Sequence, residues 1–215
     1  MLDENQRFNI HLANALEADT VENLVPEAQI VVVVGNPPYN VSTMNKSKFA
    51  SNLIEKYKSG LGEKKINIDD DYIKFIALGQ NFIENNPNSC GVLAYISNNS
   101  FLDGITHRQM RKSLLETFDK IYILNLHGNA RKKEKTPDGS KDENVFDIQV
   151  GTSINIFVKL PAHRGSDKPA KVFHADLFGN RQEKYDFLLQ HRLKKTGYER
   201  LEPVEPYYFF VPKDF

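Results

Sequence analysis

The sequence has little of several features that mark particular classes of protein. It contains one cysteine, Cys90, among its 215 residues. This excludes an intramolecular disulfide and a cysteine-rich zinc site, and it suits a reducing cytoplasm. No apolar run approaches the length of a membrane span, and the polar N-terminus from Met1 to Arg7 is unlike a secretion signal. We therefore expect a cytoplasmic protein with no membrane contact.

An excess of charge is also absent. Basic and acidic residues balance at 28 each, and the hydrophobic and charged fractions are 40% and 26%, which are near the averages for folded soluble proteins. Neutrality argues against coating of DNA by the whole surface, although local patches can still contact phosphates. The six histidines show no metal-ligand spacing, so we expect no metal site.

The longest apolar stretch is the β-branched run from Ile30 to Val34. A short, wholly apolar run predicts a strand buried on both faces, as in a parallel α/β sheet. Gly35, the first glycine of the chain, and the following Pro37 and Pro38 end this strand, because proline supplies no hydrogen-bond donor to a sheet.

Helical and strand patterns alternate along the rest of the chain, which predicts an α/β fold with right-handed crossovers. Helices are expected at 49–57, 72–83, 108–118 and 180–195, and strands at 91–97, 121–126, 152–160 and 171–175. We expect strands 30–34, 92–96 and 121–126 to be parallel neighbours, with the final strand near 152–158 antiparallel. Residues 1–160 are assigned to one domain, and 161–215 to a connector whose tail lies outside the core.

The four residues Asn36-Pro37-Pro38-Tyr39 form the motif that points to chemistry. They directly follow the predicted strand, where open α/β sheets place ligand sites. These residue types are individually uncommon, so chance occurrence in a chain of this size is on the order of one in a thousand. The alternative is a Pro-Pro turn that only ends the strand, with Tyr39 packed on the surface.

Each residue of this motif suits methylation of an amino group attached to a purine ring. Such an amine is a poor nucleophile, because its lone pair is delocalised into the ring. The Asn36 side-chain oxygen and the Pro37 carbonyl can accept its two N–H bonds and draw the nitrogen toward tetrahedral geometry. The prolines hold both acceptors in place beforehand, and Tyr39 offers a ring on which a flipped base can stack.

With this motif, the chain resembles the adenine-N6 DNA methyltransferases, and within them the methylase region of Type ISP restriction-modification enzymes. Segments 90–102, 121–129 and 144–151 are similar to the family's next strand and loop, to the strand before its variable loop, and to the approach to its last strand. The resemblance implies a partial Rossmann-like methyltransferase sheet, mostly parallel with an antiparallel final strand. It also implies S-adenosylmethionine as cofactor and double-stranded DNA with a flipped adenine as substrate.

The resemblance assigns roles to a few further residues. Phe146 holds the place of an aromatic residue that packs on the flipped base opposite Tyr39; the alternative is an ordinary core phenylalanine. Asn14 and Ala15 stand where the family contacts the adenine of the cofactor, although the family usually has Asp in place of Asn14. The basic loops at 131–135 and 46–65 are expected to be solvated, and flanking of the catalytic pocket is their alternative role.

One departure from the family concerns the cofactor. The family binds S-adenosylmethionine through a glycine-rich turn before Asn-Pro-Pro-Tyr, and no glycine precedes Gly35 here. We therefore expect a truncated enzyme that is inactive in isolation. In it, residues 1–160 are the C-terminal, catalytic half of a methyltransferase domain, and residues 161–215 are a connector toward an absent target-recognition domain. The alternative source of the cofactor half is a partner chain that carries the glycine-rich motif.

Three other readings stay open. The chain could be an inactive remnant or a subunit, it could methylate the side-chain amide of glutamine in a protein, or it could methylate N4 of cytosine, where Ser commonly replaces Asn36.

Overall fold

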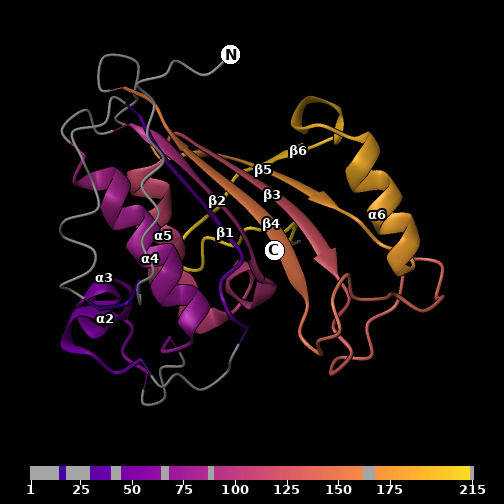
Figure 1. Ribbon diagram of the computed structural model, residues 1–215, viewed down its shortest axis with the longest axis horizontal. Coiled ribbons are helices and arrows are strands. Elements are labelled where there is room, and N and C mark those ends of the chain that lie inside the picture. Colours follow the sequence, from indigo (N-terminus) through magenta and orange to yellow (C-terminus); the bar gives the residue numbers. More distant parts are fainter. Residues whose placement is uncertain are drawn as a thin grey trace, which may run out of the picture.

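The computed structural model describes residues 15–17, 30–39, 45–63, 68–86, 90–161 and 168–213. They form a six-stranded sheet with helices on both faces (Figure 1). The strands are β1 (Val31–Gly35), β2 (Gly91–Asn98), β3 (Lys120–His127), β4 (Thr152–Lys159), β5 (Lys171–Asp176) and β6 (Glu199–Leu201). The α-helices are α2 (Lys48–Leu53), α3 (Glu55–Lys58), α4 (Asp71–Glu84), α5 (Arg108–Thr117) and α6 (Arg181–Gln190).

The strands follow the order β1-β2-β4-β3-β5-β6. β1 pairs with β2, and β3 with β5, in parallel, whereas β4 runs antiparallel between β2 and β3. The mixed α/β class and the antiparallel β4 agree with the prediction. The expectation that strands 92–96 and 121–126 are neighbours is wrong, because the later strand β4 is inserted between them. β6 adds a further antiparallel strand beside β5.

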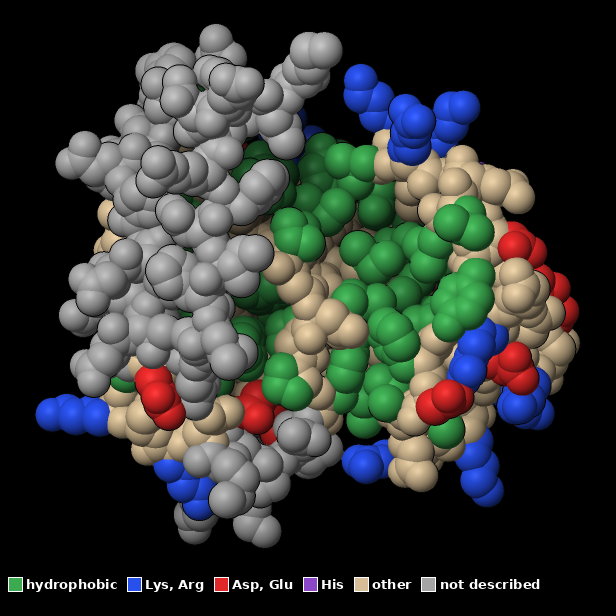
Figure 2. All heavy atoms as spheres, in the orientation of Figure 1, with side chains coloured by type: hydrophobic (Ala, Val, Ile, Leu, Met, Phe, Trp, Pro, Cys, Tyr) green, Lys and Arg blue, Asp and Glu red, His purple; other side chains and the backbone are tan. Residues whose placement is uncertain are grey.

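β1 lies at the edge of the sheet that the described strands form, and it is buried on one face only. Val31 and Val33 pack against the main core, whereas Val32 and Val34 are 62% and 73% exposed. The prediction of a strand buried on both faces is therefore wrong for this chain, since an apolar run by itself does not say which faces have a neighbour. Figure 2 shows a broad area of hydrophobic side chains on the side of the molecule turned toward the viewer.

The two faces of the sheet have different cores. Ile121 and Ile123 of β3 join the larger core, which includes residues of α4 and α5. The alternate residues Leu124 and Leu126 point to the other face and pack in a smaller cluster with Phe187 and other residues of α6. This alternation follows from the two-residue period of a strand. The sheet is therefore the middle of three layers.

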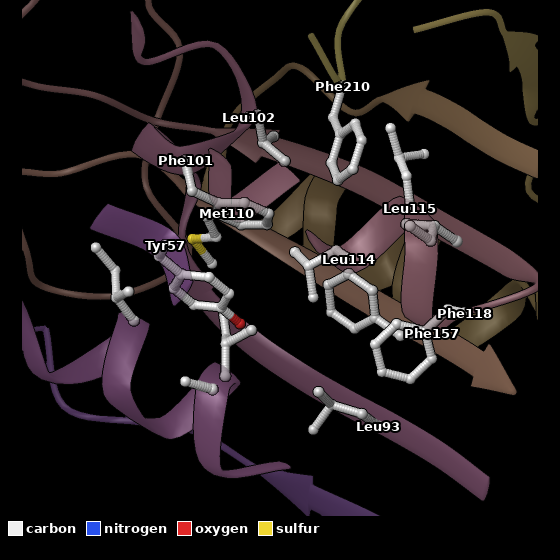
Figure 3. Close-up of a cluster of buried hydrophobic side chains, with 14 of the residues drawn as sticks. Tyr57, Leu93, Phe101, Leu102, Met110, Leu114, Leu115, Phe118, Phe157 and Phe210 are labelled. Carbon is white, nitrogen blue, oxygen red and sulfur yellow. The ribbon is translucent and has the colours of Figure 1, made fainter. Parts of the chain in front are cut away.

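The C-terminal tail contributes to the larger core. Phe210 is fully buried and meets Phe101 edge to face, with ring centroids 6.4 Å apart (Figure 3). The buried Arg111 guanidinium also donates to the Tyr207 carbonyl at 2.6 Å. The expectation that the tail lies outside the core is therefore wrong. The boundary at residue 160 stays a proposal, although β5 and β6 continue the same sheet beyond it.

Candidate active site

The Asn-Pro-Pro-Tyr motif lies directly at the carboxyl end of β1. Asn36 and Pro38 are exposed, Pro37 is buried, and Tyr39 is half-buried. The Tyr39 hydroxyl donates a hydrogen bond of 2.8 Å to the Asn36 side-chain oxygen. This bond uses only one of the two acceptor sites of that oxygen, so the same atom can accept from a second donor.

Tyr95 of β2 supports the start of the motif from the side. It pairs in register with Gly35, and a Cβ atom at Gly35 would lie 2.9 Å from the Tyr95 ring. Glycine is therefore the residue that lets the chain pass this ring on its way into the motif. Burial raises the pKa of Tyr95 to about 12.

Phe146 lies against Tyr39, although the two residues are far apart in sequence. Their ring centroids are 5.8 Å apart and the ring planes are inclined by 49°. Phe146 belongs to the loop between β3 and β4, which extends beyond the carboxyl ends of the parallel strands at the lower right of Figure 1. Burial raises the pKa of Tyr39 to about 12, so its hydroxyl keeps its proton at neutral pH.

Asn144 fixes the backbone of this loop. Its side-chain nitrogen donates to the Gly128 carbonyl at 3.0 Å and to the Val150 carbonyl at 2.6 Å. Its side-chain oxygen accepts the backbone N–H of Phe146 at 2.9 Å. One buried amide thus joins the beginning, the middle and the end of the loop.

A chain of polar side chains connects the carboxyl ends of β2, β3 and β5. The Asn125 side-chain oxygen accepts from Asn99 at 2.9 Å, and its nitrogen donates to Asp176 at 3.3 Å. Asp176 also accepts from His127 at 2.6 Å. With Glu134, these residues line a cavity of about 290 Å³.

His127 lies between two carboxylates. Its Nδ1 is 2.8 Å from Glu134 and its Nε2 is 2.6 Å from Asp176, while the ring stacks on Phe178 with centroids 3.8 Å apart. Burial alone lowers the pKa of His127, but the two acidic partners outweigh burial and raise it. Burial raises the pKa values of Glu134 and Asp176, but their contacts with His127 and other neighbours outweigh burial and lower them. Through these two contacts the ring ties the loop, at Glu134, to β5, at Asp176.

The other predicted residues do not take part in the contact of Asn36 with Tyr39 and Phe146. Asn14 falls outside the described residues, and Ala15 packs beside Leu16 in a small apolar cluster with residues of α2 and α4. Arg131, Lys132, Lys133 and Lys135 are exposed in the loop that carries Phe146.

The sequence prediction missed several residues of this region. Asn125 and His127 could have been predicted, because polar residues at the end of an apolar strand mark the edge where α/β sheets bind ligands. The buried Lys184 of α6 could not, since a lysine in a polar helix is normally exposed.

Among the described residues, no group of three or more His, Cys, Asp and Glu side chains could hold a metal ion. No helix in this part of the chain is long and apolar enough to cross a membrane.

We predict that His127 makes stability depend on pH above the ordinary histidine pKa of about 6.5. Because its folded pKa is raised, its contribution is complete below the ordinary histidine value of about 6.5 and is lost as pH rises through the folded pKa. The unfolding free energy of wild type should exceed that of His127→Gln at pH 6, and the difference should shrink at higher pH. Denaturant titrations over a pH series measure it, with His191→Gln as control. A constant difference would contradict the ion-pair assignment.

Three solved structures are similar to this chain in fold. The DrdV–DNA complex, solved by cryo-electron microscopy, is 25% identical with a TM-score of 0.68, over 81% of this chain and 17% of that chain. The ATP-dependent Type ISP restriction-modification enzyme LlaBIII bound to DNA is 27% identical with a TM-score of 0.68, over 86% and 13%. A nuclease-deletion mutant of the Type ISP enzyme LlaGI, in complex with a DNA substrate mimic, is 24% identical with a TM-score of 0.68, over 84% and 15%.

The chain therefore spans less than a fifth of the length of these three proteins. No curated protein matches it. Residues 4–131, more than half of the chain, match the Eco57I restriction-modification methylase family. The expected resemblance to the methylase region of restriction-modification enzymes is thus confirmed, and the chain belongs to the Eco57I restriction-modification methylase family.

Proposed function

We propose that this chain carries the catalytic residues for transfer of a methyl group from S-adenosylmethionine to N6 of adenine in DNA. The observation that carries the proposal is the exposed Asn36 side chain at the end of β1, bonded to Tyr39, whose ring lies against Phe146. This arrangement places a polar acceptor beside two aromatic rings, which is the chemistry that an extrahelical base with an exocyclic amine requires.

Asn36 has the central role in this mechanism. Its oxygen accepts one N–H of the adenine amine, and the Pro37 carbonyl accepts the other, so the lone pair of the nitrogen becomes available for attack. The hydrogen bond from Tyr39 orients the Asn36 amide before the base arrives. Because Tyr39 keeps its proton at neutral pH, it does not act as the base.

Tyr39 and Phe146 form the proposed platform for the flipped base. The two rings now touch at a centroid distance of 5.8 Å, so a base between them requires the rings to separate. The loop that carries Phe146 also presents Arg131, Lys132 and Lys133 to solvent, where they can contact DNA phosphates.

The described residues do not complete a cofactor site. S-adenosylmethionine supplies the methyl group when bound, but no glycine precedes Gly35, and Ala15 packs among apolar side chains. Asn14 and Ala15 stay proposed cofactor contacts on the family resemblance alone. We propose that a further segment, in the same or a partner chain, supplies the rest. Among the described strands β1 has a neighbour on one side only, and Val32 and Val34 are exposed on one of its faces; both features fit the attachment of such a segment.

The comparisons favour DNA over a protein substrate. The three similar structures are described as restriction-modification enzymes or as complexes with DNA, and the family is one of restriction-modification methylases. None of them is described as acting on glutamine. Glutamine methylation and a non-catalytic role are therefore the alternatives against which the following experiments test the proposal.

Asn36→Ala should abolish methylation and leave DNA binding intact. Loss of one acceptor aimed at the reacting nitrogen should cost on the order of 10²–10³-fold in kcat, while phosphate contacts outside the pocket keep most of the affinity. Methyl transfer to DNA should be measured in an enzyme that contains this chain with its cofactor-binding region, and affinity by fluorescence anisotropy. Asn85→Ala, an exposed amide at the end of α4, is the control. Near-normal turnover by Asn36→Ala would refute the role of this residue.

Tyr39→Ala and Phe146→Ala should each weaken capture of the extrahelical base. A stacked aromatic ring is worth roughly 1–3 kcal/mol per base, or about 5- to 150-fold in occupancy of the flipped state. A fluorescent adenine analogue at the target position reports that state on binding. Tyr39→Phe keeps the ring and should lose far less than Tyr39→Ala. An unchanged signal in both alanine variants would show that these rings do not hold the base.

A further inference from the structure

Helix α6 holds the loop segment that carries Phe146. In Figure 1 the lower end of α6 lies directly above this loop. Arg181, Lys184 and Tyr185 all reach the segment 143–146. These three positions are separated by three and four residues, so they share one face of the helix.

Every backbone carbonyl of this segment accepts a hydrogen bond from one of those three side chains. Arg181 donates to Asn144 at 2.8 Å through Nε and to Phe146 at 3.1 Å through its terminal nitrogen. The Tyr185 hydroxyl donates to Val145 at 2.5 Å. Lys184 supplies the fourth bond, to the carbonyl of Glu143 at 2.6 Å.

Lys184 also makes the least exposed ion pair of this region. Its ammonium is 2.9 Å from Asp142, and both side chains are 0% exposed. The same nitrogen donates to the Leu126 carbonyl at 2.7 Å, and Asp142 accepts the backbone N–H groups of Gly128 and Gly179. This pair therefore joins α6 to both the end of β3 and the loop.

These contacts leave Phe146 little backbone freedom. Its N–H is bonded to Asn144 and its carbonyl to Arg181, so rotation of its own side chain is the main motion left to it. A segment without a regular ladder would otherwise leave these carbonyls to water. The ring lies against Tyr39 and also packs on the apolar cluster of Leu124 and Leu126 beneath α6.

We propose that α6 is the positioning element of the base platform, with Arg181 and Tyr185 as positioning residues that act through Phe146. This inference rests on the proposed function and deepens it. Neither residue touches the base; each fixes the backbone from which the Phe146 ring projects. Base capture therefore depends on a helix that lies outside the motif-bearing part of the sheet.

The first experiment measures the position of residue 146 in the full 215-residue chain. The sequence contains no tryptophan, so Phe146→Trp introduces a single tryptophan, whose emission can be excited apart from that of the tyrosines. In that background, Arg181→Met and Tyr185→Phe should increase quenching by acrylamide and shift the emission to longer wavelength. The matched control is Gln182→Met, on the neighbouring exposed position of α6. Circular dichroism confirms folding, and Tyr185→Phe removes one hydroxyl from a side chain that is already 39% exposed.

The second experiment is a double-mutant cycle in the methylating enzyme, with the fluorescent adenine analogue as readout. Because Arg181 acts only through the Phe146 ring, Arg181→Met should reduce base capture several-fold but by less than Phe146→Ala does, with unchanged affinity for DNA. In the Phe146→Ala background the same substitution should have no further effect, since Arg181 acts through that ring.

The outcomes separate the two proposals. Unchanged quenching in both Arg181→Met and Tyr185→Phe overturns the positioning role, whatever the enzyme does. Full additivity with Phe146→Ala overturns it as well, because a merely structural effect does not need the ring. If Phe146→Ala alone leaves the analogue signal unchanged, the stacking part of the proposed function fails and the inference about base capture fails with it. If Phe146→Ala still methylates adenine in that case, the proposed adenine-N6 methylation is retained and only the stacking role of Phe146 is lost.

Discussion

The insertion of β4 between β2 and β3 is the constraint on which this site depends. β3 ends at the carboxyl edge of the sheet, and β4 must start at the same edge in order to run antiparallel to it. The connection between them is therefore confined to the edge where β1 delivers Asn36 and Tyr39. This topology explains how Phe146, more than a hundred residues later in the sequence, comes to lie against Tyr39.

Buried polar groups hold the loop that makes this connection, together with the packing of Val145 and Phe146 on Leu124 and Leu126. The Lys184–Asp142 pair, the Asn144 amide and the His127 ring each contact several backbone or side-chain partners. Removing one member of a buried ion pair costs about 3–5 kcal/mol, because the remaining charge loses its partner. The same groups that make the loop costly to disturb also give it one defined position, which a platform for a flipped base requires.

Much of the fold could be predicted from the sequence, because local patterns dominate there. The helix at 72–83 and the strands at 91–97 and 121–126 lie within one or two residues of α4, β2 and β3. The order of strands could not be predicted, since nothing in the strand 152–160 says which two strands it separates. The one-sided burial of β1 was missed for a related reason: Val32 and Val34 are as apolar as Val31 and Val33, and exposure depends on neighbours.

Part of the candidate site could also be predicted from the sequence, and part of it could not. The motif at 36–39 could be found because its residue types and its position after a strand are specific. Phe146 could be named only through the family resemblance, and its contact with Tyr39 is a property of the fold. The role of α6 could not be predicted from the sequence, because its polar residues are typical of a solvated helix. Only the fold shows that Arg181, Lys184 and Tyr185 bond to the loop.

The central claim is that the amine presented to Asn36 is N6 of adenine in DNA. It is tested most directly by giving an enzyme that contains this chain isotopically labelled S-adenosylmethionine and unmodified DNA, and then digesting the DNA to nucleosides for mass spectrometry. The account predicts label in N6-methyladenine and in no other nucleoside. Label on N4 of cytosine, or label on a protein glutamine while the DNA stays unmodified, would contradict it.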